Sequence, residues 1–140
     1  MVDRVLVPMD ESPMARHALE FALDVHATAT IDVLYVVDYV EESHTARLLV
    51  GPETLRERAL DRAERLFRDA RSLAADHGRG LTTETRFGAP AETIVRYADE
   101  TDADLIVMGS HGRSLVSSVL LGDTANTVIR RAAVPVTVVR

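Results

Sequence analysis

Five short strand-like runs alternate with four stretches of helical periodicity along the sequence, and this alternation limits the possible folds more than any other feature. Apolar runs predict strands at residues 4–9, 31–37, 105–108 and 134–139, and an alternating run predicts a strand at residues 81–87. The helical stretches lie at residues 13–27, 52–77, 91–101 and 124–131. Strands that alternate with helices in this way form a doubly wound parallel sheet with helices on both faces. We therefore expect a single α/β domain over residues 1–140.

Two of the predicted strands have features of sheet edges. Residues 81–87 alternate in character and are rich in threonine, which is typical of a strand with one exposed face. The last strand, residues 134–139, contains Pro135, which cannot donate a hydrogen bond to a neighbouring strand. Because most of its other residues are apolar, we expect an unprotected edge that a second copy of the chain would cover, giving a homodimer.

Composition excludes several classes of protein. The formal net charge of −6 and the pI near 5.3 argue against nucleic acid as a partner. No apolar run approaches the ~18–20 residues that span a bilayer, and the first residues do not resemble a signal peptide. We therefore expect no membrane partner and a cytoplasmic location. Cysteine and lysine are absent, which excludes disulfides, thiolate metal sites and the lysine of a Walker-type phosphate loop.

A glycine-rich stretch follows the fourth predicted strand. Gly109 and Gly112 frame a short loop, and Gly122 returns just before the last predicted helix. Glycine lets backbone N–H groups approach a ligand, and a helix start offers unpaired donors with partial positive charge. The stretch therefore favours an anion site, although glycines at these positions could serve only to make turns.

The first predicted strand ends in a second group of candidate residues. Pro8 and Asp10 lie at its end, and Ser12 with Pro13 predicts the cap and first position of a helix. In doubly wound sheets, ligands bind beyond the carboxyl ends of the strands, where the strand order reverses. If the first and fourth strands are neighbours there, Asp10 and Gly109 face the same crevice.

The histidines do not predict catalytic or metal chemistry. His111 lies inside the glycine-rich stretch, but the sequence identifies no acid or nucleophile as its partner. His17, His26, His44 and His77 show no metal-ligand spacing, and no Gly-x-Ser-x-Gly element is present. We expect neither a catalytic residue nor a metal ligand set from the protein alone.

Taken together, these residues resemble the universal stress protein family, in its nucleotide-binding subclass, along the whole chain. The segments that carry the resemblance are VLVPMDES, LYVVD, the Gly-Ala-Pro turn, ADLIVMGSHGR and VPVTVVR. The phosphate motif of the family has glycines separated by two and nine residues, followed by serine or threonine, and Gly109, Gly112 and Gly122 match this spacing. The resemblance implies a Rossmann-like sheet of the adenine nucleotide α hydrolase-like type, with strand order 3-2-1-4-5. It also implies binding of ATP, or another adenine nucleotide, with Mg²⁺.

Carried over position by position, the resemblance implies a nucleotide site. Pro8 and Asp10 would contact the nucleoside, and Val36 would line the adenine slot. The full set of implied site residues is Pro8, Met9, Asp10, Val36, Met108, Gly109, Ser110, His111, Gly112, Arg113, Gly122, Asp123 and Thr124. In this family the site serves a stress-response or regulatory module without efficient catalysis, although weak ATPase activity is compatible with it.

Position 123 departs from the motif. Asp123 stands where nucleotide-binding members carry a hydroxyl residue, and a carboxylate repels a triphosphate of about four negative charges. Asp123 could instead be the N-cap of the last helix, and Thr124 could supply the hydroxyl if the register shifts by one. One alternative to a nucleotide-binding module is therefore a structural or interaction dimer that binds no nucleotide. A second alternative is an ATP-consuming enzyme that uses His111 or Asp10.

Overall fold

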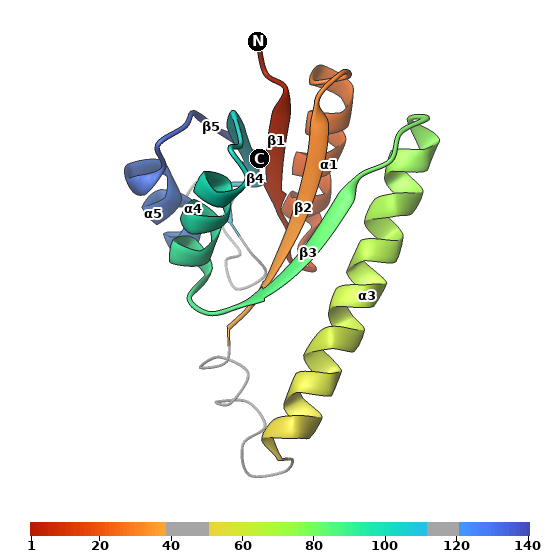
Figure 1. The fold of residues 1–140 in the computed structure, drawn as a ribbon, viewed down its shortest axis with the longest axis vertical. Helices are drawn as coiled ribbons and strands as arrows, with labels where there is room; N and C mark the ends of the chain where they lie inside the picture. The colour runs from red at the N-terminus through yellow and green to blue at the C-terminus, as the bar shows by residue number, and fades with distance from the viewer. Residues whose placement is uncertain (39–50, 112–120) are drawn as a thin grey trace.

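The computed structural model describes residues 1–38, 51–111 and 121–140 (Figure 1). Its elements are β1 (Arg4–Pro8), α1 (Pro13–Val25), β2 (Thr30–Val37), α3 (Pro52–Asp76), β3 (Thr82–Phe87), α4 (Pro90–Glu100), β4 (Leu105–Gly109), α5 (Asp123–Arg131) and β5 (Val136–Val139). Each predicted strand and helix is present, and most boundaries differ from the prediction by one or two residues. No helix in these described ranges is long and apolar enough to cross a membrane.

The sheet has the order β3-β2-β1-β4-β5, and every pair of neighbouring strands is parallel. This confirms the predicted doubly wound sheet, its strand order and both of its edges. The last strand begins at Val136, two residues later than predicted. Pro135 precedes the strand and contributes its carbonyl oxygen, which accepts a hydrogen bond of 3.0 Å from the Ile106 amide. The proline thus leads into the edge strand, where its missing N–H costs no ladder bond.

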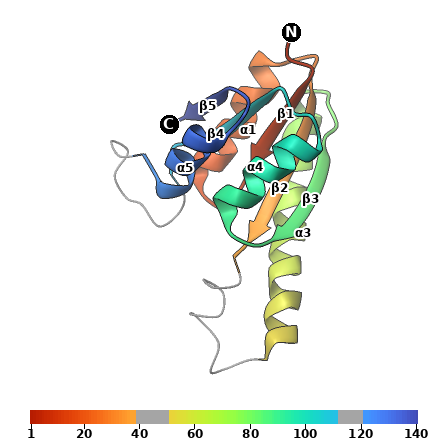
Figure 2. The ribbon, with the colours of Figure 1, turned by 60° about the vertical axis from the view of Figure 1, so that its left-hand side comes forward.

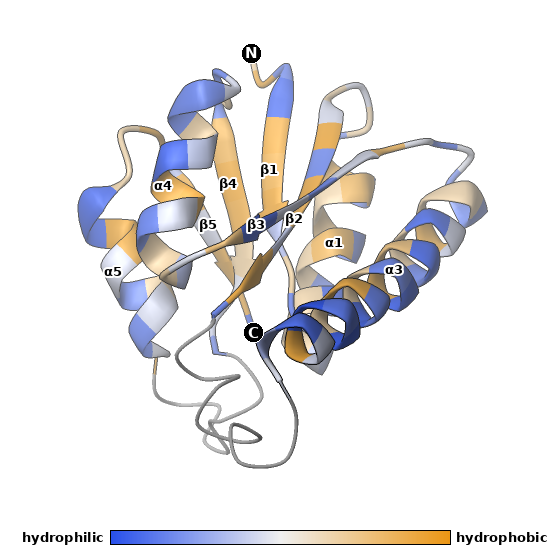
Figure 3. Cartoon of the chain, turned by 60° about the horizontal axis from the view of Figure 1, so that its bottom comes forward, coloured by the Kyte–Doolittle hydropathy of each residue, from blue (hydrophilic) through white to orange (hydrophobic). Residues whose placement is uncertain are grey.

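Helices cover both faces of the sheet (Figure 2). Side chains of β1 alternate between two apolar cores, because successive residues of a strand point to opposite faces. Val5 and Val7 belong to the core under α1 and α3, whereas Leu6 belongs to the core under α4 and α5. The central strands are accordingly mostly apolar, while the outer faces of the helices are polar (Figure 3). Each fully buried aliphatic side chain contributes roughly 1.5–3 kcal/mol of transfer free energy.

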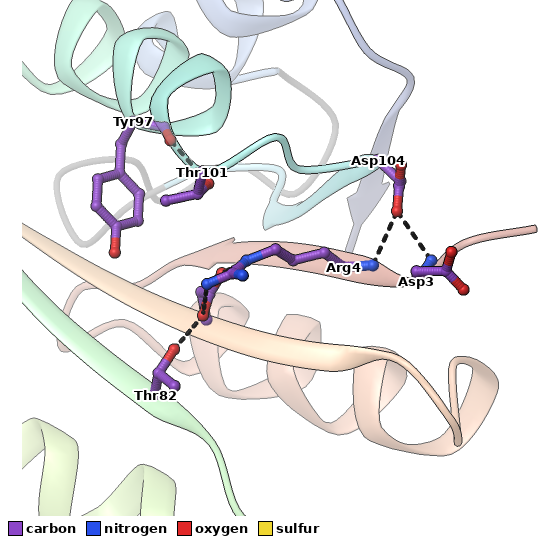
Figure 4. Close-up of polar contacts among 7 residues, drawn as sticks. Asp3, Arg4, Thr82, Tyr97, Thr101 and Asp104 are labelled. Atoms are coloured by element: carbon purple, nitrogen blue, oxygen red, sulfur yellow. Dashed lines mark hydrogen bonds and ion pairs between the residues drawn. The ribbon is translucent and has the colours of Figure 1, made fainter.

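One charged side chain lies inside the sheet. Asp32 of β2 is 1% exposed, and its carboxylate accepts hydrogen bonds from Arg4 Nε at 2.6 Å and Arg4 Nη2 at 3.2 Å. The hydroxyl of Thr82 donates to the same carboxylate, as the close-up shows (Figure 4). The three residues come from β1, β2 and the start of β3, so the group joins three strands near their amino ends. The nucleotide-site residues expected from the sequence lie toward the opposite ends of the strands.

Candidate functional site

A pocket of about 350 Å³ opens at the carboxyl ends of β1 and β4, where the strand order reverses. A volume of this size falls within the range of small-molecule sites. The expected residues that line the pocket are Pro8, Met9, Asp10, Val36, Met108, Gly109, His111, Gly122, Asp123 and Thr124. Ser110 is 3% exposed and lies beneath the lining, while Gly112 and Arg113 fall outside the described residues. The structure therefore brings together most of the set that the sequence implied.

Gly122 closes one side of the pocket. Its amide donates a hydrogen bond of 2.7 Å to the Ser110 carbonyl, which places the start of α5 against the end of β4. A Cβ atom at Gly122 would lie 3.0 Å from His111 Cα and 3.2 Å from the Ser110 carbonyl oxygen. Both neighbours are backbone atoms, so a larger residue would push the two segments apart. Close approach of the backbone, and not only a turn, explains this glycine.

Gly109 serves a related purpose at the end of β4. A Cβ atom there would lie 2.8 Å from Met14 Cβ and 3.0 Å from the Met14 carbonyl carbon. Real Cβ atoms do not approach other heavy atoms so closely, so a side chain at this position would separate β4 from the first turn of α1. The glycine therefore keeps the β4 rim and the β1–α1 rim of the pocket together.

Asp10 is held in place by the turn that follows β1. Its Oδ1 atom accepts a hydrogen bond of 2.8 Å from the Ser12 amide. Ser12 in turn caps α1, because its hydroxyl accepts a hydrogen bond of 3.2 Å from the Ala15 amide. Pro13 occupies the first turn of the helix, as the sequence predicts. This chain of local bonds orients the Asp10 carboxylate at the mouth of the pocket.

The inner part of the pocket is apolar. Leu34, Ile94 and Met108 lie there, together with Val36 at the end of β2. Apolar walls of this kind suit a heteroaromatic ring, whereas the rim is polar. Leu34 and Ile94 were not among the residues implied by the sequence. Both belong to the buried face of their own element, and their place at the pocket depends on the packing of α4 against β2.

The sequence model of the Universal stress protein family matches residues 1–140. The chain belongs to this family. A universal stress protein of Methanocaldococcus jannaschii is 31% identical over 145 residues, which is 98% of this chain and 81% of that protein. Among solved structures, hypothetical protein MJ0577 has a TM-score of 0.83 at 28% identity, covering 99% of this chain and 96% of that one. UspA from Lactobacillus plantarum has a TM-score of 0.80 at 29% identity, covering 99% and 98%.

Asp123 is not the N-cap of α5 in this universal stress protein, so that interpretation is wrong. Gly122 is the N-cap, with an extended backbone, and the Asn126 amide donates a 2.9 Å hydrogen bond to its carbonyl. Because the close approach to Ser110 fixes Gly122 at the cap, Asp123 becomes the first helical residue and its side chain is exposed. A carboxylate in the first turn still favours the helix through the helix dipole.

Ser110 and His111 form a contact that the sequence analysis did not anticipate. Ser110 Oγ lies 3.1 Å from Nδ1 of His111. The two residues are adjacent in the chain, and the direction of their side chains is decided by the turn after β4. Because the serine is buried, this contact orients the imidazole at the pocket and leaves little room for a substrate at the hydroxyl.

The pocket offers few ligands for a metal ion. No group of three or more histidine, aspartate or glutamate side chains with metal-binding geometry is present among the described residues. Magnesium commonly binds through one or two carboxylates together with the phosphates of its substrate. Asp10 and Asp123 both line the pocket and are oxygen donors of the required type. The residues present therefore fit an Mg²⁺ ion that arrives with a nucleotide.

Proposed function

We propose that this universal stress protein binds an adenine nucleotide in the pocket between β1 and β4 and acts as a regulatory module without efficient catalysis. The observation that carries the proposal is the hydrogen bond of 2.7 Å between the Gly122 amide and the Ser110 carbonyl. It sets the N–H groups of the first turn of α5, which receive no side-chain cap from the described residues, beside the apolar slot. A base could occupy the slot while phosphate oxygens accept hydrogen bonds from the helix start.

Two proteins of the same fold support adenine nucleotides as the ligand class. One is described as a universal stress protein in complex with cAMP, at 23% identity and a TM-score of 0.74. Another, from Archaeoglobus fulgidus, is described in complex with dAMP, at 22% identity and a TM-score of 0.69. At these identities the likeness extends to the fold, so the ligand class passes to this chain as part of our proposal. ATP with Mg²⁺, expected from the sequence, is the finer form of the proposal.

Regulation through a homodimer is part of the same proposal. The apolar strand β5 is the edge of the sheet beside β4, and the Ser110 amide donates a 2.8 Å hydrogen bond to the Val139 carbonyl. The edge strand that would pair with a second copy is thus bonded to Ser110, the residue between the pocket-lining residues Gly109 and His111. Nucleotide binding at the rim could bias the pairing of β5. The cytoplasmic location expected from the sequence stays a prediction.

The alternative is an interaction dimer of the same fold that binds no nucleotide. The observation that favours it is the carboxylate of Asp123, which stands exposed at the start of α5 where phosphate would bind. The two functions predict opposite results when purified protein is titrated with adenine nucleotides.

The test is calorimetric titration with AMP, cAMP and ATP plus Mg²⁺, using cytidine nucleotides as the control for base recognition. Saturable binding of an adenine nucleotide, with no binding of the cytidine counterpart, is expected. A matched pair of variants locates the site on α5: Thr124 lines the pocket and Thr127 does not. Thr124→Val should weaken binding several-fold, and Thr127→Val should leave it unchanged. Failure of the wild-type protein to bind any adenine nucleotide would overturn the proposal and leave the interaction dimer.

A further inference from the structure

The charged side chains around the pocket are mostly acidic. Asp10, Glu11, Asp38 and Asp123 all line it. Among the described lining residues, His111 is the side chain that can carry a positive charge. A ligand with several negative charges would therefore be repelled by the acidic side chains that line the pocket.

Asp123 differs from the other acidic residues in its surroundings. The carboxylate of Asp10 accepts a hydrogen bond from the Ser12 amide, and Glu11 Oε1 lies 3.7 Å from Arg62 Nε. Within the described ranges, the carboxylate of Asp123 has neither a hydrogen bond nor an ion pair. In this part of the chain, no cationic side chain is paired with Asp123 at the start of α5, where the helix N–H groups would meet a phosphate.

The effect of this charge depends on how many phosphates the ligand carries. A monophosphate has a charge of about −2 and a triphosphate about −4, so repulsion by one nearby carboxylate is greater for the triphosphate. A divalent cation removes this extra repulsion of the triphosphate, because it neutralises part of the phosphate charge and accepts a carboxylate oxygen as a ligand. The same residue then changes from a source of repulsion to a ligand.

We propose that Asp123 makes the pocket select adenine nucleotides by charge. Without a divalent cation the pocket favours AMP over ATP, and ATP binds as its Mg²⁺ complex. This inference rests on the proposed adenine-nucleotide function and specifies the ligand class of that site. It also assigns a role to the residue at which this chain departs from the phosphate motif.

The test compares two variants that remove one negative charge each. Asp123→Asn keeps the shape of the side chain in the pocket. Glu53→Gln is the matched control, because Glu53 lies in the first turn of α3 and does not line the pocket. Wild type and both variants are titrated with AMP in EDTA, ATP in EDTA and ATP with excess Mg²⁺. Thermal unfolding curves without nucleotide confirm that each variant folds.

The wild-type protein should bind AMP at least about tenfold more tightly than ATP in EDTA, and Mg²⁺ should restore ATP binding. Asp123→Asn should bring the two metal-free affinities to within roughly threefold, whereas Glu53→Gln should keep the wild-type ratio. Equal metal-free affinities of the wild type for AMP and ATP would overturn the inference. The inference would also be overturned if Asp123→Asn still bound adenine nucleotides but kept the wild-type ratio of metal-free AMP and ATP affinities. In that case the proposed function would stand. Loss of all adenine-nucleotide binding in every protein would overturn the proposed function and this inference with it.

Discussion

The amide of Gly122 donates a hydrogen bond of 2.7 Å to the carbonyl of Ser110, so the helix start that borders the pocket is fixed to the end of the central strand β4. A side chain at Gly122 would be crowded, because its Cβ atom would lie 3.0 Å from His111 Cα. This single contact determines which residue caps α5 and which residue, Asp123, becomes the first of the helix. It therefore links the phosphate side of the site to the packing of the sheet.

Gly122→Ala should lower the free energy of unfolding by roughly 1–3 kcal/mol, because the added methyl group forces two backbone segments apart. Adenine-nucleotide affinity should fall in parallel. Gly80→Ala is the matched control, since a Cβ atom there meets nothing within 4 Å. Its effect should stay within about 0.5 kcal/mol. Urea unfolding measures both variants, and equal stability of the two would contradict the close-approach argument.

The buried pair between Arg4 and Asp32 should respond unequally to loss of either partner. The side chain of Arg4 is 40% exposed, whereas that of Asp32 is 1% exposed. Among the described residues, Arg4→Met leaves the buried carboxylate with the Thr82 hydroxyl as its remaining side-chain donor, and should cost roughly 3–5 kcal/mol. Asp32→Asn leaves a guanidinium that can reach water, and should cost roughly 1–3 kcal/mol. Chemical denaturation measures the free energy of unfolding of both variants. A larger loss of stability in Asp32→Asn than in Arg4→Met would show that the unpaired buried carboxylate is not the more costly state.

The stability of the protein should depend on pH through His77. A hydrogen bond to the Leu73 carbonyl, and then one to Asp24, raises the pKa of His77 above its ordinary value of 6.5. Because the folded protein binds the proton more tightly, this stabilisation is fully present below about pH 6.5 and is lost as the pH rises through the folded pKa. The difference in melting temperature between wild type and His77→Gln should therefore shrink from about pH 5.5 to about pH 8.5. A difference in melting temperature that stays constant across this pH range would show that protonation of His77 does not stabilise the fold.

Removal of His111 should leave any slow ATP turnover unchanged. Its imidazole contacts Ser110, which is buried, and the sequence identifies no other partner for it. Phosphate release from ATP with Mg²⁺ is measured for wild type and His111→Ala at saturating nucleotide. A fall of about tenfold or more in turnover, with affinity retained, would favour the ATP-consuming enzyme instead.

Pairing through β5 should be abolished by a substitution that spares the bond between β5 and β4. The carbonyls of Pro135 and Val139 accept hydrogen bonds from β4 and from the residue that follows it, so the alternate residues Val136 and Val138 direct their backbone groups to the free edge. Val138→Pro removes one outward donor and should convert the expected dimer to a monomer in sedimentation velocity. Val138→Thr is the control and should remain dimeric. A monomeric wild-type protein would contradict pairing through this edge.

Most of the fold could be predicted from the sequence because its signals are local. The apolar runs of β1, β2 and β4 and the helical spacing of α1 and α3 each determine an element within a few residues. The cap of α1 was also predictable, since Ser12 and Pro13 are neighbours in the chain. Once alternation of strands and helices is established, the right-handed crossover leaves few topologies, and the family resemblance indicated which of them.

The site could be predicted as a set of residues but not as a geometry. Gly109 and Gly122 were expected from their spacing, whereas the reasons for them, close contact with Met14 and His111, became visible only in the structure. Leu34 was missed as a pocket residue, because its burial alone does not say which cavity it faces.

The sequence by itself determined the strands and helices and their alternation along the chain, because periodicity acts over short stretches of chain, whereas the order of the strands in the sheet was implied by the family resemblance. Tertiary structure alone decided that Asp32 meets Arg4, 28 residues away, and that His77 meets Asp24, 53 residues away. It also decided that Gly122, and not Asp123, caps α5. Contacts between distant segments depend on how strands and helices pack, and no local sequence pattern specifies which distant residues come together.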